Sequence, residues 1–134
     1  MKRTPLRKQR RKKSLRKKLW PEFSKLIRAR DGRCMLAGYF GKKCGGLLQA
    51  SHIYPKGSNP LLELHPLNCV AACFTCHLYG WHKDPMNAAR WYADLPQDWR
   101  EGLELARSNT MARKGLTQEL LRAEWALFGL REGK

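Results

Sequence analysis

The sequence has few acidic residues and no long apolar run. Of its 134 residues, 27 are Lys or Arg and only 11 are Asp or Glu, so the formal net charge is +16. Although 43% of the residues are hydrophobic, no apolar stretch approaches the ~18 residues that a membrane-spanning helix needs. The composition therefore argues against a helical membrane protein and predicts one small domain, whose modest core would gain stability from a bound metal.

A secretory signal segment is also missing from the sequence. Five cysteines without such a segment favour a reducing cytoplasm, where closely spaced cysteines hold metal rather than form disulfides. There is no internal repeat, and the only low-complexity segment is the strongly basic beginning of the chain.

The first 18 residues hold eleven Lys or Arg and no Asp or Glu. Such a block repels itself when free, so we expect residues 1 to 18 to form a disordered tail that lies along a phosphate backbone and releases counterions. A merely solubilising tail is the alternative. The predicted nucleic-acid contacts in this tail are Lys2, Arg3, Arg7, Lys8, Arg10, Arg11, Lys12 and Lys13.

Four of the five cysteines have a spacing that suits one metal ion. Cys73 and Cys76 form a C-x2-C turn, which directs two thiolates to one point, and zinc takes four such ligands at ~2.3 Å. Cys34 and Cys44 would supply the other two, across a spacer whose glycines let the chain turn back. Free or disulfide-bonded thiols are the alternative. Cys69 lies in an apolar run and is expected to be a buried small hydrophobe.

The histidines extend this pattern into a family resemblance. Residues 49–55 (QASHIYP), 65–68 (HPLN) and 73–77 (CFTCH) together resemble the HNH nuclease family, in the version whose ββα-metal motif carries a four-cysteine zinc knuckle. The order and spacing of His52, Asn68 and His77 carry the resemblance, which spans about residues 19 to 92. Small phage-type members also have a basic helical lead-in, so the resemblance implies the cytoplasm of a bacterial or phage-infected cell. The resemblance implies an α+β fold with a His-Me finger core and a metal-dependent DNA endonuclease.

The resemblance also implies a role for each of these three residues. His52 would be the general base, Asn68 would orient it and its loop, and His77 would bind a catalytic divalent cation such as Mg²⁺ or Mn²⁺. The chemistry suits these residue types, because phosphodiester hydrolysis needs a deprotonated water and a cation that neutralises charge on the phosphate. Imidazole, with an ordinary pKa of ~6.5, can accept the proton of that water near neutral pH.

The sequence departs from the family immediately before the expected base, where many members have Asp or His and this chain has Ser51. A neutral hydroxyl is a weak ligand, so either Ser51 acts through water or another side chain completes the metal site. His82, five residues after His77, is the best candidate, and a surface histidine is the alternative. His65 precedes a proline and is expected to be a packing or surface residue rather than a catalytic one.

The expected partner is DNA in double-stranded form, with phage recombination or packaging proteins as further candidates. Lys56, in a loop over residues 55 to 60, is placed to contact phosphate. A different class of function stays open: a zinc-knuckle nucleic-acid-binding protein without catalysis, in which His52 and Asn68 merely support the knuckle. Ser51 keeps that alternative open, whereas the spacing of Asn68 and His77 argues against it.

The hydrophobic periodicity predicts a helix over residues 19 to 30 and a pair of strands over 33 to 37 and 47 to 54, with His52 near the end of the second. A helix beginning near residues 73 to 75 would carry His77. Residues 93 to 134 are expected to be a helical extension of the domain, after a helix that begins at Pro85, with helices over 99 to 106 and from 117 to 128. Trp91, Trp99 and Trp125 are expected to be core or interface anchors rather than base-stacking groups.

Overall fold

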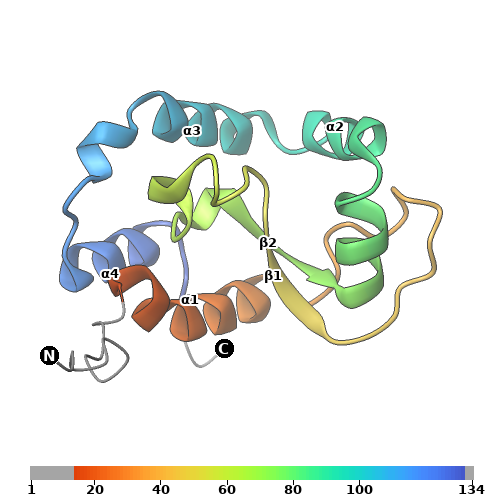
Figure 1. The fold of residues 1–134 in the computed structure, drawn as a ribbon, viewed down its shortest axis with the longest axis horizontal. Coiled ribbons are helices and arrows are strands. Elements are labelled where there is room, and N and C mark those ends of the chain that lie inside the picture. Colours follow the sequence, from red (N-terminus) through yellow and green to blue (C-terminus); the bar gives the residue numbers. More distant parts are fainter. Residues whose placement is uncertain (1–13, 132–134) are drawn as a thin grey trace, which may run out of the picture.

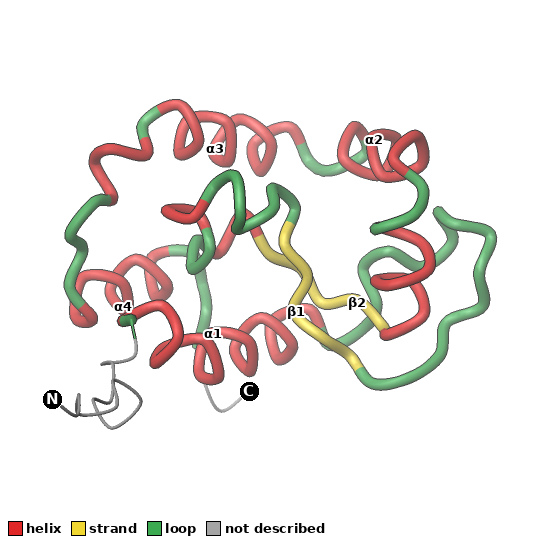
Figure 2. The backbone as a smooth tube through the Cα atoms, in the orientation of Figure 1, coloured by secondary structure: helices red, strands yellow, loops and turns green. Residues whose placement is uncertain are grey.

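A computed structural model describes residues 14–131 of the chain. The fold is a mixed α+β arrangement in which helices surround a small two-stranded antiparallel sheet (Figures 1 and 2). The elements in chain order are α1 (Leu15–Asp31), β1 (Leu48–His52), η2 (Pro60–Leu62), η3 (Pro66–Asn68), β2 (Cys69–Cys73), η4 (Cys76–Trp81), α2 (Pro85–Ala93), α3 (Gln97–Ser108), η5 (Thr110–Arg113) and α4 (Gln118–Leu127). Within the described residues, no helix has the length and apolarity needed to cross a membrane.

Helix α1 begins four residues earlier than the hydrophobic pattern predicts. The side chain of Ser14 accepts a hydrogen bond from the Lys17 amide at 3.3 Å, which caps the helix before its first apolar residue. Gly32 ends the helix with a left-handed backbone at φ 67°. The predicted boundary of the basic tail at residue 18 therefore falls inside α1. Residues 1–13, with the eight predicted nucleic-acid contacts, lie outside the described residues.

The sheet pairs β1 with β2, in register from Leu48 opposite Cys73 to His52 opposite Cys69. The predicted strand over residues 33 to 37 is wrong, because this segment forms turns and touches the sheet through the Met35 amide, which donates to the Ala71 carbonyl at 2.8 Å. The segment must bend to bring its cysteine toward the others, whereas residues 69–73 are apolar and buried on both faces. β1 therefore pairs with the buried segment 69–73 rather than with residues 33–37, which precede it in the sequence.

Two apolar clusters cover the two faces of the sheet. On one face, Ala50 and Cys69 contact the cluster that α1 and α4 contribute, and these helices lie side by side in Figure 1. On the other face, Val70 and Ala72 belong to a cluster with residues of α2 and α3. The sheet is consequently covered on both faces, which explains why so short a strand pair contains no exposed residue.

The tryptophans behave as predicted core anchors. Trp91 and Trp125 are buried, and Trp99 is half-buried against the cluster that contains residues of α2 and α3. Each indole N–H donates to a backbone carbonyl at 2.8 or 2.9 Å, the acceptors being Met35 for Trp91, Leu67 for Trp99 and Leu64 for Trp125. These bonds satisfy the only polar atom of each ring, so the tryptophans fasten α2, α3 and α4 to the central segments.

The chain turns helical directly after β2, as predicted. Residues 74 and 75 are α-helical, and the helix continues as the π-helical segment η4, in which the His82 amide donates to the His77 carbonyl at 3.2 Å. A π-helical turn brings residues five apart onto one side, so it aligns these two histidines. Gly80 permits the segment to lie against Phe40, because a Cβ there would come within 2.7 Å of the Phe40 ring.

Candidate functional site

The four cysteines predicted to share a metal come together in space. The sulfur atoms of Cys34, Cys44, Cys73 and Cys76 all lie within 4.8 Å of one another, and those of Cys44 and Cys76 are 3.8 Å apart. Four thiolates at ~2.3 Å from one ion form a tetrahedron with edges of about 3.8 Å. The cluster therefore fits a metal such as zinc.

Backbone geometry around the C-x2-C turn favours the thiolate form of Cys73. Burial by itself would raise the pKa of this thiol, but the amides of Cys76 and Gly45 point at its sulfur and lower the pKa to about 7. The Cys76 amide lies 3.3 Å from that sulfur. Gly46 allows the close approach of the neighbouring loop, since a Cβ there would come within 2.6 Å of the Phe74 Cβ.

Cys69 is not part of the four-cysteine cluster. Its side chain is fully buried among residues of α1 and α4, and burial raises the pKa of its thiol. The prediction that Cys69 is a small core hydrophobe is confirmed.

His52 is the last residue of β1, and its two ring nitrogens differ in their hydrogen bonding. Its Nε2 lies 2.9 Å from the Glu63 carbonyl oxygen, which can only accept, so Nε2 carries the proton and Nδ1 keeps its lone pair. The indole of Trp20 lies against the imidazole at 5.0 Å between centroids. Burial lowers the pKa of His52, so the ring is neutral near pH 7. A neutral imidazole with a directed lone pair is the form that a general base requires.

Asn68 holds the loop that follows His52. It is fully buried, and its Oδ1 accepts from the Tyr54 amide at 2.8 Å while its Nδ2 donates to the carbonyls of Tyr54 and Leu62 at 3.1 and 3.2 Å. One side chain thereby joins both ends of the segment that begins just after the histidine and ends just before Glu63. Because Glu63 supplies the carbonyl that orients His52, Asn68 stabilises this orientation through the loop.

His77 and His82 face each other across η4. The Nδ1 of His77 lies 2.7 Å from Oε1 of Gln49, and its Nε2 lies 3.1 Å from Nε2 of His82. With Nδ1 donating to Gln49, the lone pair of His77 is on Nε2. Two nitrogens bound to one ion at ~2.1 Å are separated by about 3.0 to 3.4 Å. The pair has the spacing of adjacent ligands, so the structure brings His82 to His77 as the sequence suggested.

The electrostatic setting keeps His77 neutral. Burial lowers its pKa to about 4, with further contributions from His82 and His52. An unprotonated imidazole is the form that coordinates a cation, so His77 is available for coordination throughout the neutral range.

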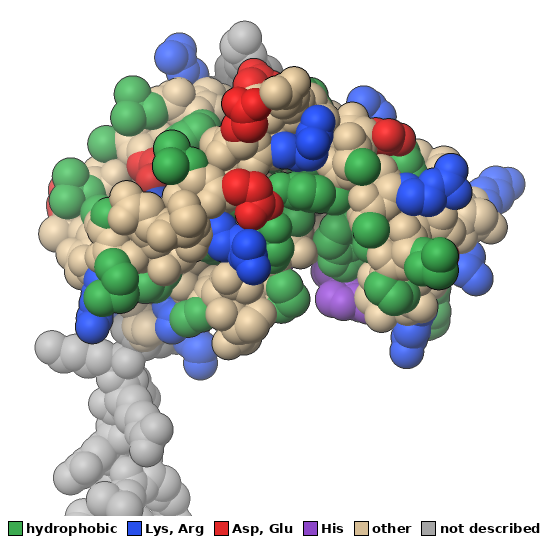
Figure 3. All heavy atoms as spheres, turned by 90° about the horizontal axis from the view of Figure 1, so that it is seen from above, with side chains coloured by type: hydrophobic (Ala, Val, Ile, Leu, Met, Phe, Trp, Pro, Cys, Tyr) green, Lys and Arg blue, Asp and Glu red, His purple; other side chains and the backbone are tan. Residues whose placement is uncertain are grey.

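The three histidines share one cavity of about 380 Å³ at the exposed edge of β1. His52 from β1 and the His77–His82 pair from η4 all line it. Trp20 and Trp81 also line this cavity, as does Lys56, whose predicted phosphate contact stays a prediction. Figure 3 shows histidine atoms at a notch in the molecular surface. A cation at the His77–His82 pair and a water beside His52 would therefore occupy a common space.

Two other residues singled out in the sequence lie elsewhere. Ser51 pairs with Val70, is 2% exposed and does not line the cavity, although its strand neighbours Ala50 and His52 do. Successive side chains of a strand point to opposite faces, so the expected role of Ser51 as a metal ligand is not what this geometry provides. His65 is buried, which agrees with a packing residue rather than a surface one.

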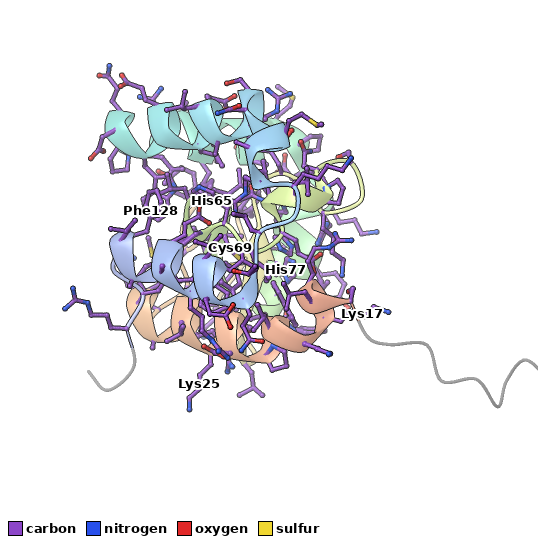
Figure 4. The ribbon with its side chains drawn as sticks, turned by 90° about the vertical axis from the view of Figure 1, so that its left-hand side faces the viewer. Lys17, Lys25, His65, Cys69, His77 and Phe128 are labelled. Carbon is purple, nitrogen blue, oxygen red and sulfur yellow. The ribbon has the colours of Figure 1, made fainter. Side chains whose placement is uncertain are left out.

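His65 acts as a local cap and packing residue. Its Nδ1 accepts from the Leu67 amide at 3.0 Å, and its ring lies 5.1 Å from that of Phe128 (Figure 4). It does not line the histidine cavity. The expectation that His65 is structural rather than catalytic fits this placement.

Sequence reasoning missed two members of the site. Gln49 fixes the tautomer of His77, and Trp20 covers one face of His52. Neither has a recognisable spacing relative to the histidine that it contacts, because β1, α1 and η4 meet only in the folded chain. Among the described residues, no Asp or Glu lines the cavity.

Comparisons of the chain with protein-family models, curated proteins and solved structures gave no match.

Proposed function

We propose that this protein is a metal-dependent endonuclease of the HNH type that hydrolyses DNA phosphodiester bonds. The observation that carries the proposal is the shared cavity, which joins a neutral His52 with a free Nδ1 to the His77–His82 pair spaced for one cation. The strand of His52, the antiparallel β2 and the helix of His77 follow one another in the order of a ββα-metal motif. The basic chain suits a polyanionic substrate.

In the proposed reaction, His52 Nδ1 removes a proton from a water as that oxygen forms a bond to phosphorus, while the bond from phosphorus to the 3′ oxygen breaks. His77 and His82 would hold a divalent cation, which when bound would offset charge developing on the phosphate and on the departing oxygen. The Glu63 carbonyl keeps the proton on Nε2 and so reserves Nδ1 for the water. Lys56 would attract the phosphate to the cavity margin.

We further propose that Cys34, Cys44, Cys73 and Cys76 hold a structural zinc ion. The cluster ties together the loop before β1 and the start of the helix after β2. The segment that carries Cys34 and Cys44 forms no helix or strand, so bound zinc would supply part of the folding free energy of this half of the domain. The zinc would keep η4, and with it His77, in place beside β1.

A nucleic-acid-binding protein without catalysis is the second candidate. The observation that favours it is the absence of a carboxylate around the cavity in the described part of the chain. Hard cations such as Mg²⁺ prefer oxygen ligands, and two imidazoles suit a softer divalent ion. The metal panel in the following experiment separates the two functions.

The test is incubation of the full chain with supercoiled plasmid across Mg²⁺, Mn²⁺, Co²⁺, Ni²⁺ and Zn²⁺, with and without chelator. We expect metal-dependent nicking that His52→Ala reduces by roughly 10² to 10⁴-fold, the usual contribution of a positioned base. His65→Ala serves as a histidine control that lies outside the cavity. Unchanged nicking by His52→Ala would overturn the assignment of the base, and no nicking by the parent with any metal would leave only the binding function.

A further inference from the structure

The outward face of α1 is basic along most of its length. Leu19, Phe23, Leu26 and Ile27 are buried, and the face opposite them carries Lys17, Pro21, Ser24, Lys25 and Arg28. Lys17, Lys25 and Arg28 are all exposed. In Figure 4 the labelled Lys17 and Lys25 side chains both extend away from the body of the protein. We call Lys17, Lys25 and Arg28 the α1 basic face.

The acidic residues of α1 do not compensate this charge. The Glu22 carboxylate is held by Arg122 of α4 at 2.6 and 3.0 Å, and Asp31 is held by Arg30 and by the Ala71 amide. In the part of the chain that the structure describes, no residue of the α1 basic face forms an ion pair. The positive field of this face is therefore directed to solvent, where it would attract a polyanion.

The α1 basic face lies next to the histidine cavity. Trp20, less than one turn after Lys17, lines the cavity and contacts His52. Lys56 stands at the margin of the same cavity on the loop after β1. A phosphate chain lying on α1 would thus pass from Lys17 directly to the space between His52 and the His77–His82 pair.

We propose that the α1 basic face is a phosphate-binding surface that holds the nucleic-acid backbone leading into the cavity, an inference that rests on the proposed function. Lys17 and Arg28 are eleven residues apart, which corresponds to roughly 16 Å along a helix. At 3.4 Å per phosphate along the axis of one DNA strand, this length covers about five phosphates. A basic helix face of this length would set the direction in which the duplex crosses the cavity.

A basic helix face can also serve only to keep a protein soluble, and the salt dependence of binding distinguishes these roles. Each neutralised phosphate contributes about −0.9 to the slope of log affinity against log salt. A solvated lysine contributes almost nothing to that slope. Replacing contact residues should therefore flatten the slope by a countable amount, whereas replacing equally charged residues elsewhere should not.

The test compares Lys17→Gln/Lys25→Gln with the matched control Arg90→Gln/Lys114→Gln, in which both cations are exposed and lie on α2 and before α4. Both variants remove two positive charges and no buried side chain. Binding of the full chain to a labelled 30-base-pair duplex is followed by anisotropy in chelator over a range of salt, and plasmid nicking is measured separately.

We expect the α1 variant to lower the magnitude of the salt slope by about 1.8, from two contacts at about 0.9 each, and the control to leave it near that of the parent. Equal slopes for the two variants, with binding and nicking by the parent intact, would overturn the α1 surface and leave the proposed nuclease standing. A parent that neither binds nor nicks DNA would overturn both. A parent that binds with the expected slopes but does not nick would keep the α1 surface and remove the catalytic function.

Discussion

The Nδ1 of His77 lies 2.7 Å from the side-chain oxygen of Gln49, so an amide on β1 sets the tautomer of a histidine on η4. This hydrogen bond leaves the lone pair of His77 on Nε2, the nitrogen that faces His82. Hydrogen bonds of this kind, made by the nitrogen that does not bind metal, orient a ligand and strengthen its basicity. Gln49 thereby links the strand of the proposed base to the proposed metal site.

Replacing Gln49 by Leu should raise the metal concentration needed for half-maximal nicking by roughly 10 to 100-fold, because the His77 ring loses its orienting partner. Gln49→Glu retains an oxygen acceptor and should recover most of the affinity. Titration of nicking against metal for the parent and both variants measures this. An identical metal requirement in the Leu variant would show that the hydrogen bond has no role in metal binding.

Ser51→Asp should destabilise the protein rather than improve the metal site. Ser51 is 2% exposed and lies off the cavity, so an aspartate there would bury a charge without a partner. We expect a loss of about 1 to 3 kcal/mol or more in the free energy of unfolding, measured by denaturant titration. Ser51→Ala is the size-matched control. A lower metal requirement in Ser51→Asp would place the side chain in the metal site after all.

Replacing Cys34, Cys44, Cys73 or Cys76 by Ser should abolish stoichiometric zinc binding and unfold or strongly destabilise the domain, because metal binding to such a cluster contributes to folding. Cys69→Ala should keep the zinc content, since its side chain is buried away from the cluster. Metal analysis of purified protein together with circular dichroism checks both. A metal-free parent that stays fully folded would rule out a structural role for zinc.

The stability of the protein should fall as the pH drops below about 6.5, in part because of His65. Burial lowers the pKa of His65 from 6.5 to about 4, so the unfolded chain binds its proton more tightly throughout that window. His65 alone should cost about 2 kcal/mol between pH 7 and pH 5. His65→Gln should weaken the pH dependence of the unfolding free energy relative to the parent. The same pH dependence in both proteins would contradict this contribution.

Deleting residues 1–13 should weaken binding to all DNA sequences alike and flatten its salt dependence, by about 0.9 in slope for each phosphate that the tail neutralises. The deletion leaves Ser14 to cap α1, which a cut after residue 18 would destroy. A scrambled tail of the same composition is the control and should bind like the parent. An unchanged salt slope after deletion would mean that the tail touches no phosphate.

The sequence alone determined the local and chemical features of this protein. The C-x2-C spacing and the glycine-containing spacer predicted the four-cysteine cluster, because ligand geometry constrains spacing within a short segment. Periodic apolar residues located most of the helices, and capping residues such as Thr117 marked their starts. The five-residue separation of His77 and His82 suggested His82 as a partner of His77, but the π-helical backbone of η4 is what brings the two side chains together.

Only the tertiary structure decided which distant segments meet. The partner of β1 is β2 rather than residues 33–37, because the folded chain buries residues 69–73 on both faces. The same packing turns Ser51 away from the cavity and brings Gln49 to His77 and Trp20 to His52. These two pairs join residues 28 and 32 positions apart, over which local periodicity carries no information. Burial of apolar surface from the whole chain selects one such arrangement, and the site depends on that selection.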